Sequence, residues 1–206
     1  MHKQQHIFFT ARPLAAVFLF LFPLCPAPAQ TLAGDTFAIP QHIMSSGKLN
    51  AEQLATFVTV TAIDGDAERA ARLAPLYIAE AQLEGVNHDI AFAQMILETG
   101  FLQFKGLVNP QMNNFCGLGA TSPKQTGHVF PDERTGIRAH IQHLKAYASK
   151  EPLAGALIDP RYHFVNPKGK APTIDALTGT WAQDPKYAAK IKSLLKRMYY
   201  SANAGS

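Results

Sequence analysis

Cysteine and charge are both scarce in this sequence. Only two cysteines are present, Cys25 and Cys116, and charged residues make up 17% of the chain. Cys25 lies in an N-terminal segment that we expect to be removed, so Cys116 has no partner for an internal disulfide and packing must supply the stability. The formal net charge of +4 is too small to indicate a nucleic-acid partner.

Long hydrophobic runs are also missing. The longest one, residues 14–24, is too short to cross the roughly 30 Å of a bilayer as a helix. Basic residues precede it and small residues at 27–29 follow it, which is the pattern of a secretory signal peptide. The alternatives are an N-terminal membrane anchor and a lipidated Cys25, and the large Leu24 argues against lipidation.

These features predict a chain of four parts. The expected parts are a signal peptide over residues 1–29, a linker over 30–42, one folded domain over 43–200 and a flexible tail over 201–206. After removal of the signal peptide we expect a periplasmic or secreted monomer without integral membrane contact.

Hydrophobic periodicity predicts a mainly helical domain. Helices are expected from Asn50 to a break near residue 63, over 67–85, over 87–100, over 135–150, over 173–179 and from 184 onwards. Pro75 predicts a kink or break in the second of these helices. Residues 119–136 are rich in Gly, Ser, Pro and Thr and predict a small hairpin lobe beside the helical body.

The helix over residues 87–100 is apolar on nearly every side, so we expect it to be buried. Two polar side chains interrupt it, Gln94 and Glu98, and their spacing of four places them on one face. Burial and the negative end of the helix dipole both favour the neutral form of Glu98. A carboxylic acid that keeps its proton near neutral pH is suited to general acid catalysis. The alternative is a structural ion pair with an Arg or Lys.

Other residues suggest further hypotheses. The turn with Asn113, Asn114 and Phe115 could present amides and a ring to a polar ligand, or be an ordinary loop. Trp181 could stack on a sugar or pack in the core.

Histidine and cysteine supply two more hypotheses. Cys116 could pair with a histidine (His128, His140 or His143) as a nucleophile, although a small turn residue is the simpler interpretation. His140 and His143 have a spacing that metal ligands can have, but no Glu-bearing zinc motif accompanies them. We therefore predict no metal and no cofactor.

Three stretches in order resemble the glucosaminidase family of peptidoglycan hydrolases, glycoside hydrolase family 73, which includes flagellar hydrolases and autolysins. The stretches are AFAQMILETG at 91–100, NNFCGL at 113–118 and WAQDPKYA at 181–188. The resemblance implies a mainly α (α+β), lysozyme-like fold, in which a helical body and a small β-hairpin lobe form a substrate groove. It also implies cleavage of peptidoglycan glycan strands at the β-1,4 bond between N-acetylglucosamine and N-acetylmuramic acid.

The resemblance also implies roles for single residues. Glu98 matches the catalytic acid, Tyr187 matches the tyrosine near the cleaved bond, and Asn114 and Phe115 match the turn that lines the groove. The expected substrate-binding residues are Gln94, Asn113, Asn114, Phe115 and Trp181.

The sequence departs from the family at one position. Many members carry a second glutamate near the helix that follows the β lobe, where Thr135 is the closest match here. Glu133 and then Asp132 are the candidates to replace it.

Three mechanisms remain open. An inverting route needs a base about 6.5–9.5 Å from the acid, and a retaining route needs a nucleophile about 5–5.5 Å away. In the third route the substrate's own N-acetyl group is the nucleophile and Tyr187 positions it, which the missing glutamate favours. A lytic transglycosylase, an inactive wall-binding module and a Cys/His peptidase are the alternative functions.

Overall fold

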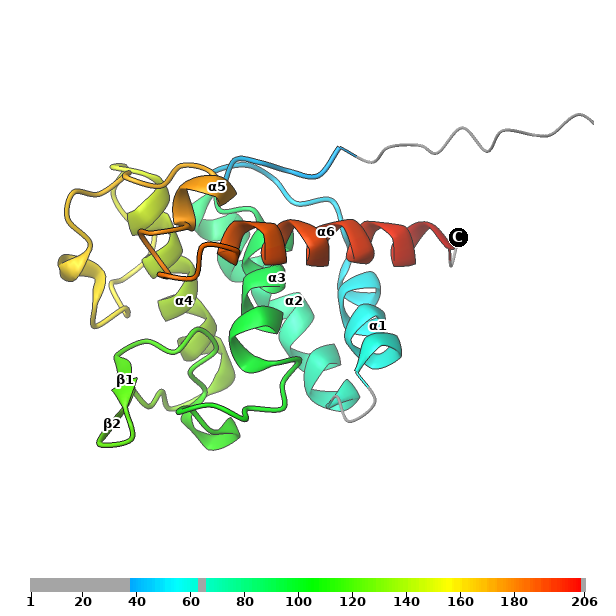
Figure 1. Cartoon of the computed structure of the whole chain (residues 1–206), viewed down its shortest axis with the longest axis horizontal. Coiled ribbons are helices and arrows are strands. Elements are labelled where there is room, and N and C mark those ends of the chain that lie inside the picture. The colour runs from blue at the N-terminus through cyan, green and yellow to red at the C-terminus, as the bar shows by residue number, and fades with distance from the viewer. Residues whose placement is uncertain (1–37, 63–65, 205–206) are drawn as a thin grey trace, which may run out of the picture. The chain divides into compact units, whose positions relative to one another are not determined.

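The computed structural model describes residues 38–62 and 66–204, and the predicted signal peptide lies outside these residues. The described chain is mainly helical, as predicted, with one small antiparallel hairpin (Figure 1). Its elements are α1 (Ala51–Thr61), α2 (Ala67–Glu84), α3 (His88–Thr99), η1 (Pro110–Met112), β1 (Ala120–Ser122), β2 (Gln125–Thr126), α4 (Glu133–Ala148), η2 (Tyr162–Phe164), α5 (Ile174–Leu177) and α6 (Tyr187–Ala204).

Helix α3 is the centre of this arrangement. It packs against α1, α2, α4 and α6, and every residue from 89 to 96 is buried. The Asn87 side chain accepts the amide of Ile90 at the start of α3, and Gly100 ends the helix in the left-handed region with φ of 59°. An L-residue with a Cβ is strained there, which explains the glycine. The predicted buried helix is confirmed.

Helix α2 excludes the break that was one of the two predicted effects of Pro75, the other being a kink. The helix is continuous from Ala67 to Glu84, with Pro75 inside it. Pro75 and Ala71, four residues earlier, are both exposed. Water can therefore solvate the carbonyl group that a proline leaves without a hydrogen bond, while the opposite face of the helix remains packed.

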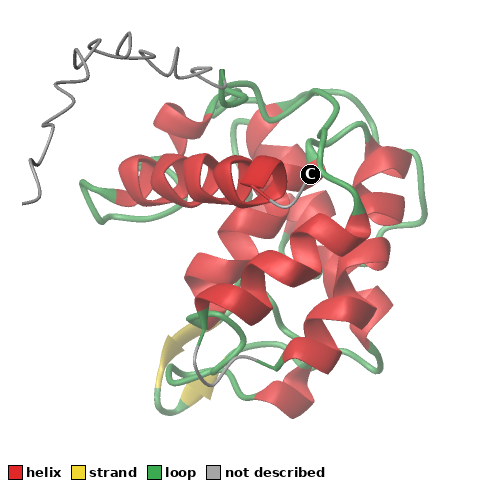
Figure 2. Cartoon of the chain, turned by 90° about the vertical axis from the view of Figure 1, so that its right-hand side faces the viewer, coloured by secondary structure: helices red, strands yellow, loops and turns green. Residues whose placement is uncertain are grey.

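The hairpin lies within the predicted residues 119–136, and the helix that follows it starts earlier than predicted. Figure 2 shows the two strands as a small lobe at the edge of the helical body. Helix α4 begins two residues earlier than expected because Asp132 caps it, accepting the amide of Thr135.

The expected linker and tail are partly ordered. Ile39 packs against the core and His42 pairs with Thr173, so residues 38–42 belong to the domain. Helix α6 runs to Ala204, so residues 201–204 are helical and do not form a free tail. None of the helices in the described residues is both long and apolar enough to span a membrane.

Candidate active site

Glu98 lies in the last turn of α3, where that helix meets the first residue of α6. The Tyr187 hydroxyl donates a hydrogen bond to Glu98 Oε1 at 2.5 Å, and the Trp181 Nε1–H donates to the same oxygen at 3.1 Å. Glu98 Oε2 receives neither bond and is available to carry the acid proton. Residues that are 83 and 89 positions apart from Glu98 along the chain thus fix the orientation of its carboxyl group.

The environment of Glu98 favours its neutral form. Burial raises the pKa of the Glu98 carboxyl, and the hydrogen bonds from Tyr187 and Trp181 only partly oppose this effect. Among the described residues, no Arg or Lys forms an ion pair with Glu98, so the structural alternative has no support. Burial and the nearby Glu98 charge raise the pKa of Tyr187 well above its usual value, so that its hydroxyl remains a donor.

A chain of buried side chains holds Tyr187 in place. Gln94 Nε2 donates to the Tyr187 oxygen at 2.9 Å, and Gln94 Oε1 lies 3.0 Å from His140 Nε2. His140 Nδ1 lies 2.9 Å from the Tyr77 hydroxyl. Burial lowers the pKa of His140 to about 3, so the ring is neutral and carries one hydrogen.

The directions of the hydrogen bonds in this chain follow from the single hydroxyl proton of Tyr187 and the single ring hydrogen of His140. The only proton of Tyr187 goes to Glu98, so the Tyr187 oxygen must accept from the amide nitrogen of Gln94. Gln94 Oε1 must then accept from Nε2–H of His140, and the Tyr77 hydroxyl must donate to the bare Nδ1. One arrangement of hydrogens satisfies all five side chains, which rigidifies the acid.

A hollow of about 210 Å³ lies beside Trp181, which donates a hydrogen bond to Glu98, although Glu98 itself is not among the lining residues. We call it the Trp181 groove, and its lining consists of Cys116, Gly117, Leu118, Gly119, Ala120, Thr121, His143, Tyr147, Arg161 and Trp181. Trp181 joins it to Glu98, because its ring lines the hollow and its Nε1–H binds the carboxyl group. Trp181 also contacts Tyr147, with ring centroids 5.2 Å apart, so a two-ring aromatic wall faces the groove.

The turn of residues 113–118 lines the groove with its residues 116–118, while its residues 114 and 115 are buried beneath them. Asn114 and Phe115 are both fully buried, contrary to the expectation that they line the groove. The Asn114 amide holds the turn closed through Leu118 and reaches the carbonyl of His128, while the turn's glycines form the lining. The side chain of Asn113 donates to the Phe130 carbonyl.

Gln94 also differs from its expected place. Its side chain is fully buried and occupied by Tyr187 and His140, so it cannot bind substrate directly. Trp181 is half-buried and lines the groove.

The two candidates for a second carboxylate have other contacts. Asp132 caps α4, and its hydrogen bond to Thr135 lowers the pKa of the carboxyl. Glu133 forms ion pairs with Arg69 at 3.0 Å and Arg72 at 3.5 Å. Neither carboxylate lines the Trp181 groove. These contacts give both residues structural roles.

Cysteine chemistry has little support at this site. Cys116 lies in the groove lining, but burial raises the pKa of its thiol well above the usual value. A nucleophilic cysteine needs the opposite shift. The nearest groove histidine, His143, has its Nδ1 2.7 Å from Asp159.

Several residues of the site were not predicted from the sequence. Tyr77, Tyr147, Asp159 and Arg161 had no local pattern to mark them. His140 was noticed only for its spacing from His143, and its partners come from other helices.

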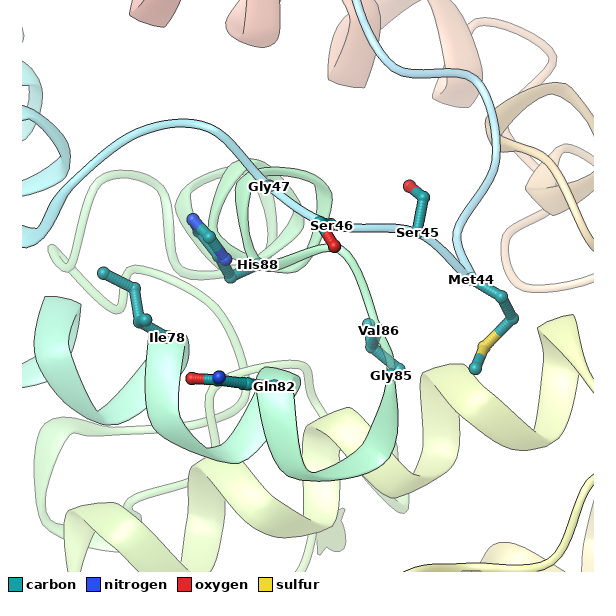
Figure 3. Close-up of a pocket in the computed structure, with 9 residues that line it drawn as sticks. All are labelled: Met44, Ser45, Ser46, Gly47, Ile78, Gln82, Gly85, Val86 and His88. Carbon is teal, nitrogen blue, oxygen red and sulfur yellow. The ribbon is translucent and has the colours of Figure 1, made fainter.

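A larger hollow lies elsewhere in the domain. It has a volume of about 440 Å³ and lies between the extended segment 44–47 and the facing ends of α2 and α3 (Figure 3). Its lining includes Gln82 and His88 but no carboxylic acid. This hollow therefore contains no carboxyl group comparable to that of Glu98.

A carboxyl group with a raised pKa, hydrogen-bonded to an aromatic residue of a groove in a mainly helical domain, is compatible with the general acid of a glycoside hydrolase. The family model of the glucosaminidases, described as mannosyl-glycoprotein endo-beta-N-acetylglucosaminidase, matches residues 74–200. An uncharacterized protein of Borreliella burgdorferi is 43% identical over 162 residues, which cover 79% of each chain. The chain belongs to the glucosaminidase family, as its three motifs predicted, and this membership supports an endo-β-N-acetylglucosaminidase type of activity.

Proposed function

We propose that this protein is an exported endo-β-N-acetylglucosaminidase that hydrolyses the glycan strands of peptidoglycan, with Glu98 as the general acid. One observation carries the proposal: the Glu98 carboxyl is half-buried with a raised pKa, has no cationic partner among the described residues and is held through one oxygen by Tyr187 and Trp181. The wall substrate and the N-terminal sequence pattern together support a periplasmic or secreted location.

The proposed reaction begins with proton transfer. Oε2 of Glu98 gives its proton to the glycosidic oxygen as the bond between that oxygen and the anomeric carbon breaks. The leaving sugar departs with a hydroxyl group, and Glu98 becomes a carboxylate. Tyr187 and Trp181 then stabilise the new charge, because both already donate hydrogen bonds to Oε1.

For the second half of the reaction we favour assistance by the substrate. The carbonyl oxygen of the N-acetyl group attacks the anomeric carbon from the opposite side and forms a cyclic oxazolinium ion. Water then adds to that carbon, reopens the ring and returns its proton to Glu98, which restores the acid. This route needs no second carboxylate, in keeping with the structural contacts of Glu133 and Asp132. The net stereochemistry is retention.

Two other functions share part of the geometry. A lytic transglycosylase would use the same acid but close a 1,6-anhydro ring in place of adding water. An inactive wall-binding module would need no carboxyl group with a raised pKa, so the state of Glu98 favours catalysis.

Product analysis separates these functions. Purified peptidoglycan is digested with the protein and the new chain ends are identified by mass spectrometry before and after borohydride reduction. The proposal predicts reducing N-acetylglucosamine ends. Reducing N-acetylmuramic acid ends, 1,6-anhydro ends or an unchanged polymer would each contradict it.

A further inference from the structure

A buried carboxylate organises one wall of the Trp181 groove. Asp159 is only 1% exposed, and its two oxygens bind different partners. Oδ1 accepts the backbone amide of Arg161 at 2.8 Å, and Oδ2 lies 2.7 Å from His143 Nδ1. Gln142 supports the same loop, because its Oε1 accepts the amides of Ile158 and Asp159. Two side chains of α4, His143 and Gln142, therefore hold the loop that carries Arg161.

The Arg161 side chain is a cation without a fixed counter-ion. It lines the groove, is half-buried and lies over the ring of Phe164, 4.8 Å from the ring centroid. Among the described carboxylates, none lies within ion-pair distance of its guanidinium. Asp159 does not form an ion pair with this guanidinium, because it accepts the backbone amide of Arg161.

A second cation lies beside the same aromatic wall. The ammonium group of Lys170 is 4.8 Å from the ring centroid of Tyr147, and Tyr147 contacts Trp181. Lys170 likewise forms no ion pair with a described carboxylate. Two unpaired cations, one in the groove lining and one over the ring of Tyr147, thus lie near the aromatic pair that includes the Glu98 partner Trp181.

We infer that Arg161, assisted by Lys170, forms a subsite for a carboxylate attached to the glycan strand bound in the Trp181 groove. A guanidinium group offers paired N–H donors that match the two oxygens of a carboxylate. The rings of Trp181 and Tyr147 offer apolar faces to the sugar that carries it. The inference rests on the proposed function and adds the substrate feature that the site selects.

Peptidoglycan supplies such a carboxylate from two sources. The lactyl group of N-acetylmuramic acid has a free carboxyl group when the peptide is absent, and the peptide stem has its own carboxyl groups when it is present. Oligomers of N-acetylglucosamine alone have neither. Comparison of the three ligands therefore tests the subsite and also identifies the source.

The experiment measures binding without turnover, in the Glu98→Gln background. The probes are a peptidoglycan tetrasaccharide with its peptide stems, the same tetrasaccharide after an amidase has removed the stems, and the N-acetylglucosamine tetramer. Arg161→Gln is the test variant and Lys170→Gln is a second one. Arg197→Gln is the matched control, because Arg197 also lies over a ring, that of Phe57, but does not line the groove.

Arg161→Gln should raise the Kd of a carboxylate-bearing probe by about tenfold and change that of the neutral tetramer by less than about twofold. Loss confined to the stem-bearing probe assigns the peptide carboxylate, and loss with the stripped probe assigns the lactyl group. Lys170→Gln should show the same selectivity with a smaller effect. Equal loss for all three probes, or no loss for any, would overturn the inference.

The experiments distinguish failure of the proposed hydrolase function from failure of the carboxylate subsite. A protein that binds these probes with dependence on Arg161, but whose form with Glu98 intact cuts none of them, would refute the hydrolase while the carboxylate subsite remained. Conversely, hydrolysis that is equally fast in the Arg161→Gln variant on all substrates would support the hydrolase and count against the subsite.

Discussion

Gln94 and Glu98 lie one helical turn apart on α3 and share one partner, the hydroxyl group of Tyr187. Gln94 donates to this hydroxyl, and the hydroxyl donates to Glu98. The spacing of four residues therefore produces a clamp in which one side chain orients the tyrosine that orients the acid. His140 and Tyr77 extend the clamp to α4 and α2.

Tyr187→Phe should change the pH profile as well as the rate. The hydrogen bond from Tyr187 favours the charged form of Glu98, so its removal raises the pKa of Glu98 further. The acid then keeps its proton to higher pH, and the descending limb of the kcat profile moves to higher pH. We expect kcat to fall by about 10- to 100-fold, since a hydrogen bond to the ionised acid is lost. Tyr200→Phe is the control, because Tyr200 is 74% exposed.

The ionisation of Glu98 should also appear in the stability of the protein. Its pKa is higher in the folded than in the unfolded chain, so the folded state binds the proton more tightly. The stabilisation linked to this proton is complete below the ordinary pKa of a glutamic acid and is lost as the pH rises through the raised pKa. Thermal unfolding should show wild type losing stability relative to Glu98→Gln across this range. A constant difference between the two proteins would argue against the raised pKa.

Tyr77→Phe tests the far end of the hydrogen-bond chain. The substitution keeps the ring and removes the donor to His140 Nδ1, which leaves a buried nitrogen without a partner. We expect a loss of about 1–3 kcal/mol in the free energy of unfolding, measured with urea. An unchanged unfolding midpoint would show that this hydrogen bond contributes nothing to stability.

Substitutions at Glu133 and Asp132 test their structural roles. Glu133→Gln weakens the ion pair with the buried Arg69 and should reduce stability by about 1–2 kcal/mol. Asp132→Ala removes the cap of α4 and should cost about 1 kcal/mol. Both variants should keep kcat within about threefold of wild type, because a general acid or base would contribute at least about 100-fold. A larger loss at either position would restore it as a second catalytic carboxylate.

Local patterns predicted the parts of the molecule that depend on neighbours in the chain. The cap at Asn87, the apolar positions up to Ile96 and the stop at Gly100 define α3 without reference to any other element. The same pattern identified Glu98 as an acid on a buried helix, where the structure shows it half-buried. The sequence could not decide whether Pro75 breaks α2, because its exposure on the helix depends on tertiary packing.

The partners of the acid depend on the folded chain. His140 is 46 residues from Gln94 and 63 from Tyr77, and no local pattern relates them. Asn114 and Phe115 stand in a motif that marks the groove, but their burial shows that they support its lining from behind. Motif position could not predict which side chains of this turn are exposed and which are buried.

The most direct test compares Glu98→Gln with Glu133→Gln on the same purified glycan strands. Both substitutions replace a glutamate by its neutral isostere, and only the first removes the proposed acid. The account predicts that Glu98→Gln lowers kcat by about 1,000-fold or more while Glu133→Gln remains close to wild type. A Glu98→Gln variant that releases products at the wild-type rate would contradict the account.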